Sequence, residues 1–244
     1  EDIINIMKKL NINDFKVNNI SIYQTAFTHK SYCKLEDYSS FNNVSNYLPL
    51  QNESYETLEF LGDSVLSLII TDYLYKRYFK IYNLDEGFLT KLKNKIVNGA
   101  SLTELSKLLE LSNFLIISKY VEGQCNGRNN ERILEDIFES FLGAIYLDTN
   151  DFYITQTILI TIIEKYIDFT ELIINDTNYK DQVLRYFQNN FKQQPKYETC
   201  KENDIYKTTL YLNDEKYSSG CGKTKKKSEQ ESAKNTLINL GILN

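Results

Sequence analysis

The chain has 244 residues, of which 42% are hydrophobic, enough for one large domain or two ordinary ones with apolar cores. Its net charge of −5 argues against a nonspecific nucleic-acid binder. The charge is unevenly divided, because residues 176–244 carry 12 Lys and Arg against 9 Asp and Glu, a net +3, which leaves −8 for the preceding residues. An acidic front and a basic tail fit a metal-using catalytic body with a polyanion-binding appendage.

No segment of the sequence predicts membrane insertion or secretion. The longest apolar stretch, Val65 to Ile70, is interrupted by Ser67 and is far shorter than the roughly 20 residues of a membrane span. No basic-then-apolar leader follows Glu1, so we expect a cytoplasmic protein without a targeting segment.

The cysteine pattern does not indicate a structural zinc site. Four cysteines are scattered without a C-x-x-C pair, and the single histidine, His29, cannot complete a zinc set with ligand-like spacing. We therefore expect four reduced thiols, at Cys33, Cys125, Cys200 and Cys221.

Apolar residues recur at three- and four-residue steps through the first part of the chain, to about Ile167, which predicts an all-α body. The periodic stretches are residues 20–33, 56–79, 88–97, 101–110 and 131–147. Between the first two of these, residues 36–55 are polar, rich in Ser and Asn and contain Pro49, so they predict a long loop or insertion.

The end of the chain has a different pattern. Residues 170–178 finish in a polar run that predicts a short linker. An amphipathic helix then precedes three short β-like runs and a final helix, so the order is α-β-β-β-α. The expected ranges are 180–191 for the helix, 196–201, 205–212 and 215–221 for the strands, and 224–240 for the last helix. We expect domains at 1–172 and 178–244.

Two of the predicted helices carry acidic stripes. Glu56, Glu59 and Asp63 lie at i, i+3 and i+7, which places them on one face of a helix. Asp136 and Glu139 start the same spacing on the second helix, and a glycine at the next position of the stripe leaves room beside them.

Carboxylates in apolar surroundings are costly, and like-charged neighbours add to the cost. Such groups therefore protonate, pair with cations or hold a metal. An oxygen-rich cluster suits Mg²⁺ or Mn²⁺. The spacing alone leaves open that these acids face solvent on amphipathic helices, and it does not separate Asp136 from Glu131 or Glu135.

The first acidic segment, Glu56-Thr-Leu-Glu-Phe-Leu-Gly-Asp-Ser-Val-Leu, resembles the signature of the ribonuclease III family. Three further segments match that family in order: Phe27-Thr-His-Lys-Ser-Tyr, Asp85-Glu-Gly, and Ile133-Leu-Glu-Asp-Ile-Phe-Glu-Ser-Phe-Leu-Gly-Ala. The C-terminal unit is similar to a double-stranded-RNA-binding domain. The resemblance covers nearly the whole chain and implies an all-α nuclease domain followed by a small α+β domain.

Carried over by position, the family's catalytic and metal-binding acids fall on four residues that are all present, Glu59, Asp63, Asp136 and Glu139. Two further acids, Glu56 and Glu86, match supporting positions near the dimer interface and the edge of the active site. His29 falls on a motif position that is expected to be structural. Thr57 stands where many relatives have Arg, which puts one surface or interface contact in doubt.

The resemblance implies Mg²⁺-dependent hydrolysis of double-stranded RNA, with Mn²⁺ as a substitute and no small-molecule cofactor. The ends would be a 5′-phosphate and a 3′-hydroxyl with a two-nucleotide 3′ overhang. It also implies a homodimer through the nuclease domain, in which each active site cuts one strand. The alternative is a noncatalytic protein that binds or sequesters double-stranded RNA on the same fold, although such proteins usually lose metal ligands.

The last helix begins with a lysine cluster that fits phosphate binding. Thr224 is the expected N-cap, and Lys225, Lys226 and Lys227 follow in the first turn. Lysines at the N-terminus of a helix interact unfavourably with the helix dipole. A bound phosphate makes the arrangement favourable, because the backbone amides and the ammonium groups both face the anion. We therefore predict RNA contacts at these four residues. A plain solvated cluster is the alternative interpretation.

The contact to the RNA minor groove is expected to be weaker than the contact to phosphates. The loop Lys201-Glu-Asn-Asp-Ile-Tyr lacks the Gly-Pro-x-His type motif of many relatives. Leu184 and Arg185 replace the polar or acidic residues that are common on the first helix of such domains. We expect modest affinity from this domain alone.

Overall fold

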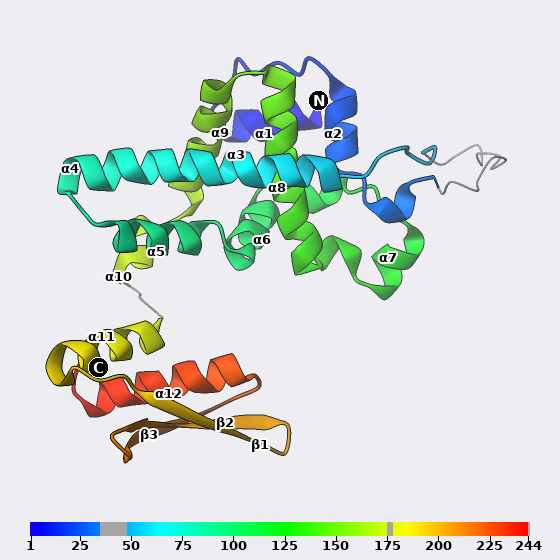
Figure 1. Ribbon diagram of the computed structural model, residues 1–244. Helices are drawn as coiled ribbons and strands as arrows, with labels where there is room; N and C mark the ends of the chain where they lie inside the picture. The colour runs from blue at the N-terminus through cyan, green and yellow to red at the C-terminus, as the bar shows by residue number, and fades with distance from the viewer. Residues whose placement is uncertain (35–47, 175–177, 244) are drawn as a thin grey trace. The chain divides into compact units, whose positions relative to one another are not determined.

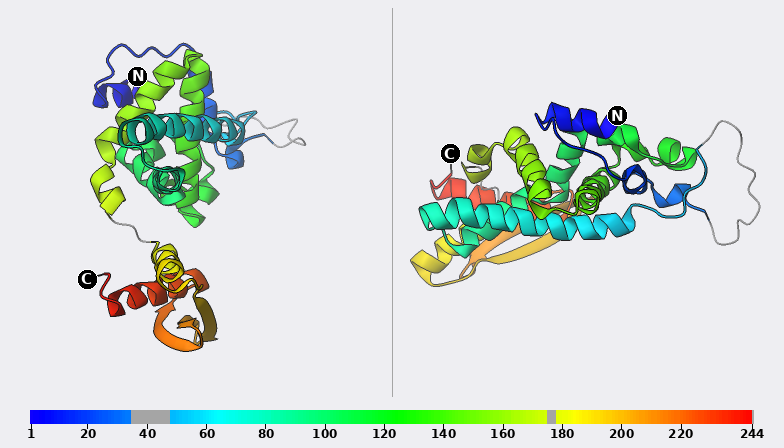
Figure 2. Two further views of the ribbon diagram at one scale, coloured as in Figure 1. Left: turned by 60° about the vertical axis from the view of Figure 1, so that its left-hand side comes forward. Right: turned by 90° about the horizontal axis from the view of Figure 1, so that it is seen from above.

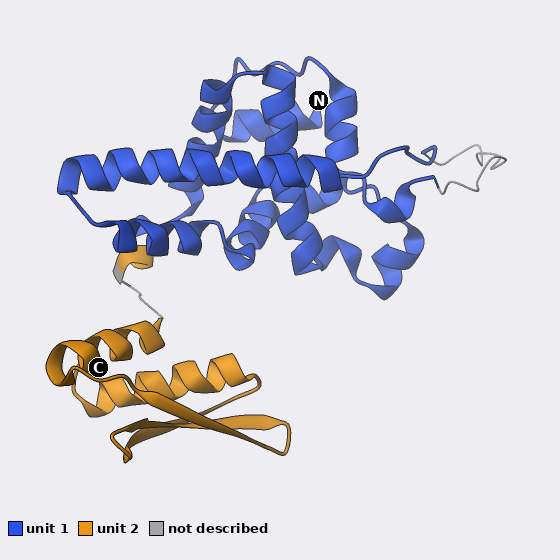
Figure 3. Cartoon of the chain, viewed as in Figure 1, with its two compact units in different colours: residues 1–169 blue, residues 170–244 orange. Residues whose placement is uncertain are grey.

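The computed structural model describes residues 1–34, 48–174 and 178–243. The chain divides into two compact units, Glu1–Phe169 and Thr170–Asn244 (Figure 3). Much of the predicted insertion at 36–55 lies outside the described residues. In the part of the chain that is described, no helix has both the length and the apolar character needed to cross a membrane.

The first unit is helical, which confirms the predicted all-α body. Its elements are α1 (Asp2–Lys9), α2 (Ile20–Ala26), η1 (Lys30–Tyr32), α3 (Glu56–Leu74), η2 (Tyr75–Phe79), α4 (Lys80–Tyr82), α5 (Glu86–Ile96), α6 (Gly99–Leu108), η3 (Leu111–Phe114), α7 (Lys119–Gln124), η4 (Gly127–Asn129), α8 (Glu131–Thr149) and α9 (Phe152–Tyr166). Of the short turns, η2 is π-helical and continues α3.

Asparagine residues mark where α6 begins and where α8 begins and ends. Asn98 accepts a hydrogen bond from the backbone N–H of Ser101 at the start of α6. Asn130 accepts from the backbone N–H of Arg132 at the start of α8. Asn150 ends α8 in the left-handed conformation, with φ of 47°. These local signals fix the length of α8 and therefore the position of its acids.

Helices α3 and α8 cross at the centre of the first unit (Figure 1). An ideal Cβ built on Gly62 would lie 1.8 Å from the carbonyl oxygen of Glu139, and one on Gly143 would lie 2.4 Å from that of Leu58. Because no side chain fits at either position, the two backbones touch directly. The crossing is surrounded by fully buried apolar side chains, including Leu66, Ile69, Ile70, Ile137 and Phe138.

The far end of α8 carries a buried aspartate. Asp148 accepts hydrogen bonds from the Tyr23 hydroxyl at 3.0 Å and from the backbone N–H groups of Asn18 at 3.0 Å and Asn19 at 2.6 Å. This carboxylate is therefore satisfied, and it ties the start of α2 to α8.

The second unit has the predicted order α-β-β-β-α. Its elements are α11 (Tyr179–Phe191), β1 (Lys196–Glu202), β2 (Ile205–Leu212), β3 (Glu215–Gly222) and α12 (Lys225–Asn239). The strands form an antiparallel sheet in the order β1-β2-β3. Both helices cover one face of it (Figure 2). The core between them contains Val183, Phe187, Leu210, Leu212, Ala233 and Leu237.

Both hairpins of the sheet turn on an Asn-Asp pair with positive φ. The values are 45° and 62° at Asn203 and Asp204, and 51° and 63° at Asn213 and Asp214. Two residues with positive φ suit the tight turns that match the twist of antiparallel strands. The β1–β2 loop is therefore short.

A short helix, α10 (Phe169–Ile174), covers the first residues of the predicted linker at 170–178, where the sequence pattern predicts no helix. The ring of Phe169 lies 5.9 Å from that of Tyr73 and 6.4 Å from that of Tyr78. These aromatic contacts lie within the first unit, which ends at Phe169.

Candidate active site and RNA interface

Carboxylates from α3 and α8 line a cavity of about 510 Å³, here called the acid cavity. Its acidic lining comprises Glu59, Glu131, Glu135, Asp136 and Glu139, and the start of α6 closes one side. The structure therefore brings together three of the four acids predicted as catalytic. The cavity also includes Arg132.

The fourth predicted acid, Asp63, lies on α3 one turn beyond Glu59 and is exposed. It is not part of the cavity lining. Its negative charge nevertheless raises the pKa of Glu139, more than the charge of any other neighbour does. Asp63 is therefore close enough to Glu139 for their charges to interact, although it does not line the acid cavity.

The acids repel one another. Burial raises the pKa of Glu139 to about 8, and the charges of Asp63, Glu135, Glu59 and Asp136 add to that effect. Burial, followed by the charge of Asp136, also raises the pKa of Glu59. A pKa near 8 favours the protonated form of Glu139 at neutral pH. A cation bound nearby would stabilise the ionised forms of Glu139 and Glu59.

A buried tyrosine contacts one of these acids, and sequence reasoning missed it. The Tyr55 hydroxyl donates a hydrogen bond to Oδ2 of Asp136 at 3.0 Å. Burial raises the pKa of Asp136, while the hydrogen bond from Tyr55 acts in the opposite direction. The signal in the sequence was the position of Tyr55 directly before the first acidic stripe, but nothing local indicates its partner on α8.

Sequence spacing could not separate the acids of α8, whereas the structure gives them different neighbours. Asp136 receives the bond from Tyr55. Glu135 lies over the start of α6, because a Cβ on Gly99 would come within 2.5 Å of its Oε2. Glu131 is exposed in the first turn of α8.

A second cavity, of about 580 Å³, shares Glu59, Asp136 and Arg132 with the acid cavity and is also lined by His29 and Lys30. Nδ1 of His29 accepts a hydrogen bond from the backbone N–H of Ser31 at 3.1 Å, at the start of η1. Burial and the charge of Lys30 lower the pKa of His29. This capping contact agrees with the structural part expected for His29.

The two predicted supporting acids lie in different places. Glu56 lines the second cavity, and its carboxylate pairs with Lys30 at 3.1 Å, which lowers its pKa. Glu86 lies in the first turn of α5, where it accepts a hydrogen bond from the Thr90 hydroxyl at 2.7 Å. Glu86 lines neither of these two cavities.

Across residues 1–34, 48–174 and 178–243, no three Asp, Glu, His or Cys side chains converge closely enough to hold a metal ion as they stand. The chemistry of the donors in the acid cavity still fits a hard divalent cation. They are carboxylate oxygens, the ligands that Mg²⁺ and Mn²⁺ prefer, and burial followed by mutual repulsion raises the pKa values of Glu59 and Glu139, a cost of the charged forms that a bound cation would offset.

An apolar stripe runs along the exposed side of α3 and η2. The exposed fractions are 79% for Phe60, 58% for Leu68, 45% for Tyr75 and 38% for Phe79. Steps of eight, seven and four residues return to the same side of a helix. Large apolar side chains in such a row are typical of a surface that another protein covers.

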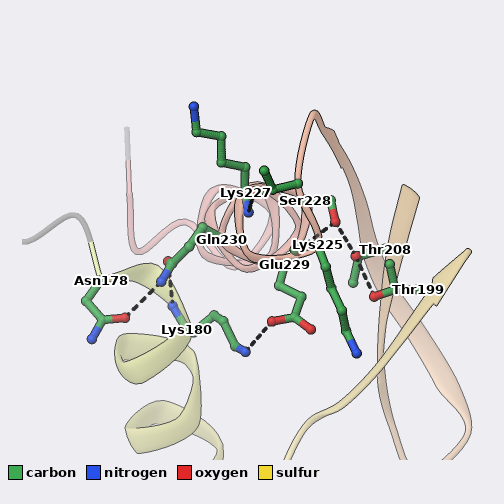
Figure 4. Close-up of polar contacts among 10 residues, drawn as sticks. Asn178, Lys180, Thr199, Thr208, Lys225, Lys227, Ser228, Glu229 and Gln230 are labelled. Atoms are coloured by element: carbon green, nitrogen blue, oxygen red, sulfur yellow. Dashed lines mark hydrogen bonds and ion pairs between the residues drawn. The ribbon is translucent and has the colours of Figure 1, made fainter. Parts of the chain in front are cut away.

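In the second unit, Thr224 is the N-cap of α12, as predicted, and its hydroxyl accepts a hydrogen bond from the backbone N–H of Lys227 at 3.2 Å. Lys225, Lys226 and Lys227 are exposed. Figure 4 shows the side chains of Lys225 and Lys227 leaving the helix in different directions. The cluster therefore presents ammonium groups to more than one side of the helix start.

The start of α12 is held close to the sheet by small residues. A Cβ on Gly222 would lie 2.7 Å from the backbone nitrogen of Ser228. A chain of hydroxyls links Ser228 to Thr208 at 2.7 Å and Thr208 to Thr199 at 2.8 Å (Figure 4). This polar contact fixes the lysine cluster relative to the strands.

Helix α11 holds the other side of α12. Lys180 pairs with Glu229 at 2.6 Å, and its backbone N–H donates to the Gln230 side chain at 3.2 Å (Figure 4). The amide nitrogen of Gln230 in turn donates to Asn178 at 3.1 Å. The first two turns of α12 are therefore fixed between the sheet and α11.

Comparisons with known proteins match both units. A family model described as Ribonuclease-III-like matches residues 19–166, and a model of the double-stranded RNA binding motif matches residues 179–240. The nuclease domain of ribonuclease III from Campylobacter jejuni, solved in a study of flexibility in its dimer-forming region, has a TM-score of 0.51 and 30% identity over 66% of this chain and 94% of its own.

Curated relatives carry matching names. The chain is 35% identical over 228 residues to "Ribonuclease 3" of Borreliella afzelii, covering 90% of this chain and 85% of the relative. It is 33% identical over 247 residues to "Ribonuclease 3" of Fusobacterium nucleatum, covering 99% and 97%. A "Probable ribonuclease 3" of Acanthamoeba polyphaga mimivirus is 40% identical over 82% of this chain, which spans 37% of that protein.

Proposed function

This chain belongs to the ribonuclease III family, and from that premise we propose that it cuts double-stranded RNA by hydrolysis at the acid cavity. The observation that carries the proposal is the convergence of acids from two crossing helices on one cavity. We assign the nuclease domain to residues 1–172 and the double-stranded-RNA-binding domain to residues 178–244.

Four carboxylates would hold the divalent metal ions, Mg²⁺ or, as a substitute, Mn²⁺: Glu59, Asp63, Asp136 and Glu139. When bound, the metal supplies positive charge that activates a water oxygen and neutralises the leaving oxygen of the phosphodiester. The products are a 5′-phosphate and a 3′-hydroxyl, with a two-nucleotide 3′ overhang.

The residues of the chain have separate parts in this chemistry. Glu59 on α3 faces Asp136 and Glu139 on α8, so the glycine contact between these helices sets the width of the acid cavity. Glu139 is the acid whose pKa is raised most clearly, so it gains most from a positive charge beside it. Glu56 and Glu86 support the site from outside the acid cavity.

The second unit would supply affinity for the duplex. Thr224 and the three lysines after it contact RNA phosphates, because the start of a fixed helix and three exposed ammonium groups both attract anions. Such domains read A-form shape rather than base sequence. The tight β1–β2 turn supports the expectation that minor-groove contact is small.

The apolar stripe on α3 and η2 would contact a second copy of this chain. Four large apolar side chains exposed in one row are costly in water, and a nuclease domain that cuts one strand needs a partner to cut the other. The dimer-forming region of the Campylobacter jejuni nuclease domain also supports a homodimer.

The alternative is a noncatalytic protein that binds or sequesters double-stranded RNA. The presence of all four acids disfavours it, because loss of metal ligands carries no penalty for a protein that only binds.

Glu139→Gln tests the proposal. The amide keeps the shape of the side chain and removes its charge, so cleavage of a long RNA duplex in Mg²⁺ should be nearly abolished while duplex binding and the far-UV circular dichroism spectrum stay unchanged. Glu104→Gln is the matched control, because Glu104 is an exposed acid of α6 outside the lining of the acid cavity. A Glu139→Gln protein with wild-type activity would contradict the proposal.

A further inference from the structure

Tyr55 links three parts of the nuclease unit. It is 4% exposed and directly precedes α3. Its backbone N–H donates to the carbonyl oxygen of Thr28 at 2.8 Å, and its own carbonyl oxygen accepts from the backbone N–H of Glu59 at 2.8 Å. Its hydroxyl reaches Asp136 on α8 at 3.0 Å. Hydrogen bonds therefore hold both the backbone and the hydroxyl of Tyr55 in place.

The contact with Tyr55 gives the two carboxylate oxygens of Asp136 different surroundings. The hydroxyl donates to Oδ2, and among the described residues it is the one hydrogen-bond donor to the side chain of Asp136. Oδ1 has no hydrogen-bond donor among the described residues and stays available to a ligand, and Asp136 lines both the acid cavity and the second cavity. A carboxylate that binds a metal is commonly oriented in this way by a neighbouring donor.

We propose that Tyr55 is a positioning residue, whose hydroxyl orients Asp136 toward the acid cavity and thereby sets the affinity of that cavity for divalent cations. This inference rests on the proposed metal-binding function of the acids. It assigns to Tyr55 no contact with RNA or with the reacting atoms.

A second Tyr–Asp contact on α8 provides a matched control. Tyr23 donates to Oδ2 of Asp148 at 3.0 Å and is 1% exposed, so it repeats the Tyr–Asp contact at the other end of α8. Asp148 lies outside the acid cavity, and two backbone N–H groups also hold it. Tyr23→Phe therefore removes an equivalent hydrogen bond without touching the proposed metal ligands.

The test measures Mn²⁺ binding to the full chain without RNA, by electron paramagnetic resonance of the free ion. Wild type, Tyr55→Phe, Tyr23→Phe and Glu139→Gln are compared, with urea unfolding as the measure of stability. Tyr55→Phe should weaken Mn²⁺ binding about 10-fold or more. Tyr23→Phe should bind Mn²⁺ as wild type does, although both tyrosine variants lose stability.

The outcomes separate this inference from the proposed function. Equal Mn²⁺ affinity in Tyr55→Phe and wild type would overturn the positioning role while the proposed function stands. A wild-type protein that binds no Mn²⁺, or a Glu139→Gln protein that binds it normally, would overturn both.

A second measurement leaves residue 55 unchanged, in case Tyr55→Phe does not fold. The wild-type protein is labelled with ¹³C at the Cζ atoms of its tyrosines and is titrated with Mg²⁺ while NMR spectra are recorded. The Tyr55 resonance should shift on addition of Mg²⁺, and the same resonance should shift in the Asp136→Asn protein. The resonance that disappears in Tyr23→Phe should stay in place. If no tyrosine resonance responds to both Mg²⁺ and Asp136→Asn, the inference is wrong.

Discussion

Replacing Gly143 by Ala should destabilise the nuclease unit although alanine is the better helix former. The new Cβ would lie 2.4 Å from the carbonyl oxygen of Leu58, where ordinary contact begins at 3.4 Å, so α3 and α8 must separate locally by about 1 Å. Overpacking costs about 1–3 kcal/mol, at the upper end here because the opposing atom is backbone. Alanine recovers about 1 kcal/mol of helix propensity. We expect a net loss of about 2 kcal/mol.

Urea unfolding followed by circular dichroism at the helical minimum measures this loss. With an m-value of about 2 kcal/mol/M, the midpoint should fall by roughly 1 M. Gly123→Ala is the control, because Gly123 lies in α7 with nothing within 4 Å of its Cβ position, so it should leave the midpoint equal or slightly higher. A Gly143→Ala protein that unfolds at or above the wild-type midpoint would refute direct backbone contact at the crossing.

Further predictions concern the RNA-binding domain, the buried tyrosine of α2 and the dimer. Replacing Lys225 and Lys226 by Ala should weaken duplex binding and reduce its salt slope by up to about two units, measured by titration at several salt concentrations, and an unchanged slope would leave these lysines as solvated surface. Burial and the charge of Asp148 raise the pKa of Tyr23, so its contribution to stability is full below the unfolded value of about 10 and is lost as pH rises above it. Between pH 9 and pH 11, about one unit on either side of that value, the urea midpoint of Tyr23→Phe should therefore fall less than the midpoint of wild type. An equal fall in both proteins would contradict a raised pKa of Tyr23 in the folded state. A purified heterodimer of wild-type and Glu139→Gln chains should nick one strand per binding event, and clean double-strand cuts or no activity would contradict one complete site per chain.

Local periodicity was sufficient to predict most elements. The predicted helix at 131–147 is α8 at Glu131–Thr149, and the three predicted strands differ from β1, β2 and β3 by one residue or none at each end. Apolar spacing, asparagine caps and Asn-Asp turns are local signals, so the sequence contains them directly.

The candidate site could be predicted only in part, because it depends on contacts between distant segments. The spacing placed Glu59 correctly on one face of α3, but it could not show which acid of α8 that face meets. Glu135 and Asp136 are adjacent in sequence, and only the positions of Gly99 and Tyr55 distinguish them. Glu86 was expected at a supporting position near the dimer interface and the edge of the active site; it lies outside both cavities, and its supporting part stays a prediction.

The most direct test of the catalytic assignment is to incubate the wild-type chain with a long RNA duplex in Mg²⁺ and to map the ends of the products. We predict cuts in both strands, with 5′-phosphate and 3′-hydroxyl ends and two-nucleotide 3′ overhangs, and no cuts when the metal is chelated or when Glu139→Gln replaces the wild type. Intact duplex after incubation of a folded, duplex-binding wild-type protein, or cleavage that continues after chelation, would contradict the assignment of the acid cavity as a metal-dependent nuclease site.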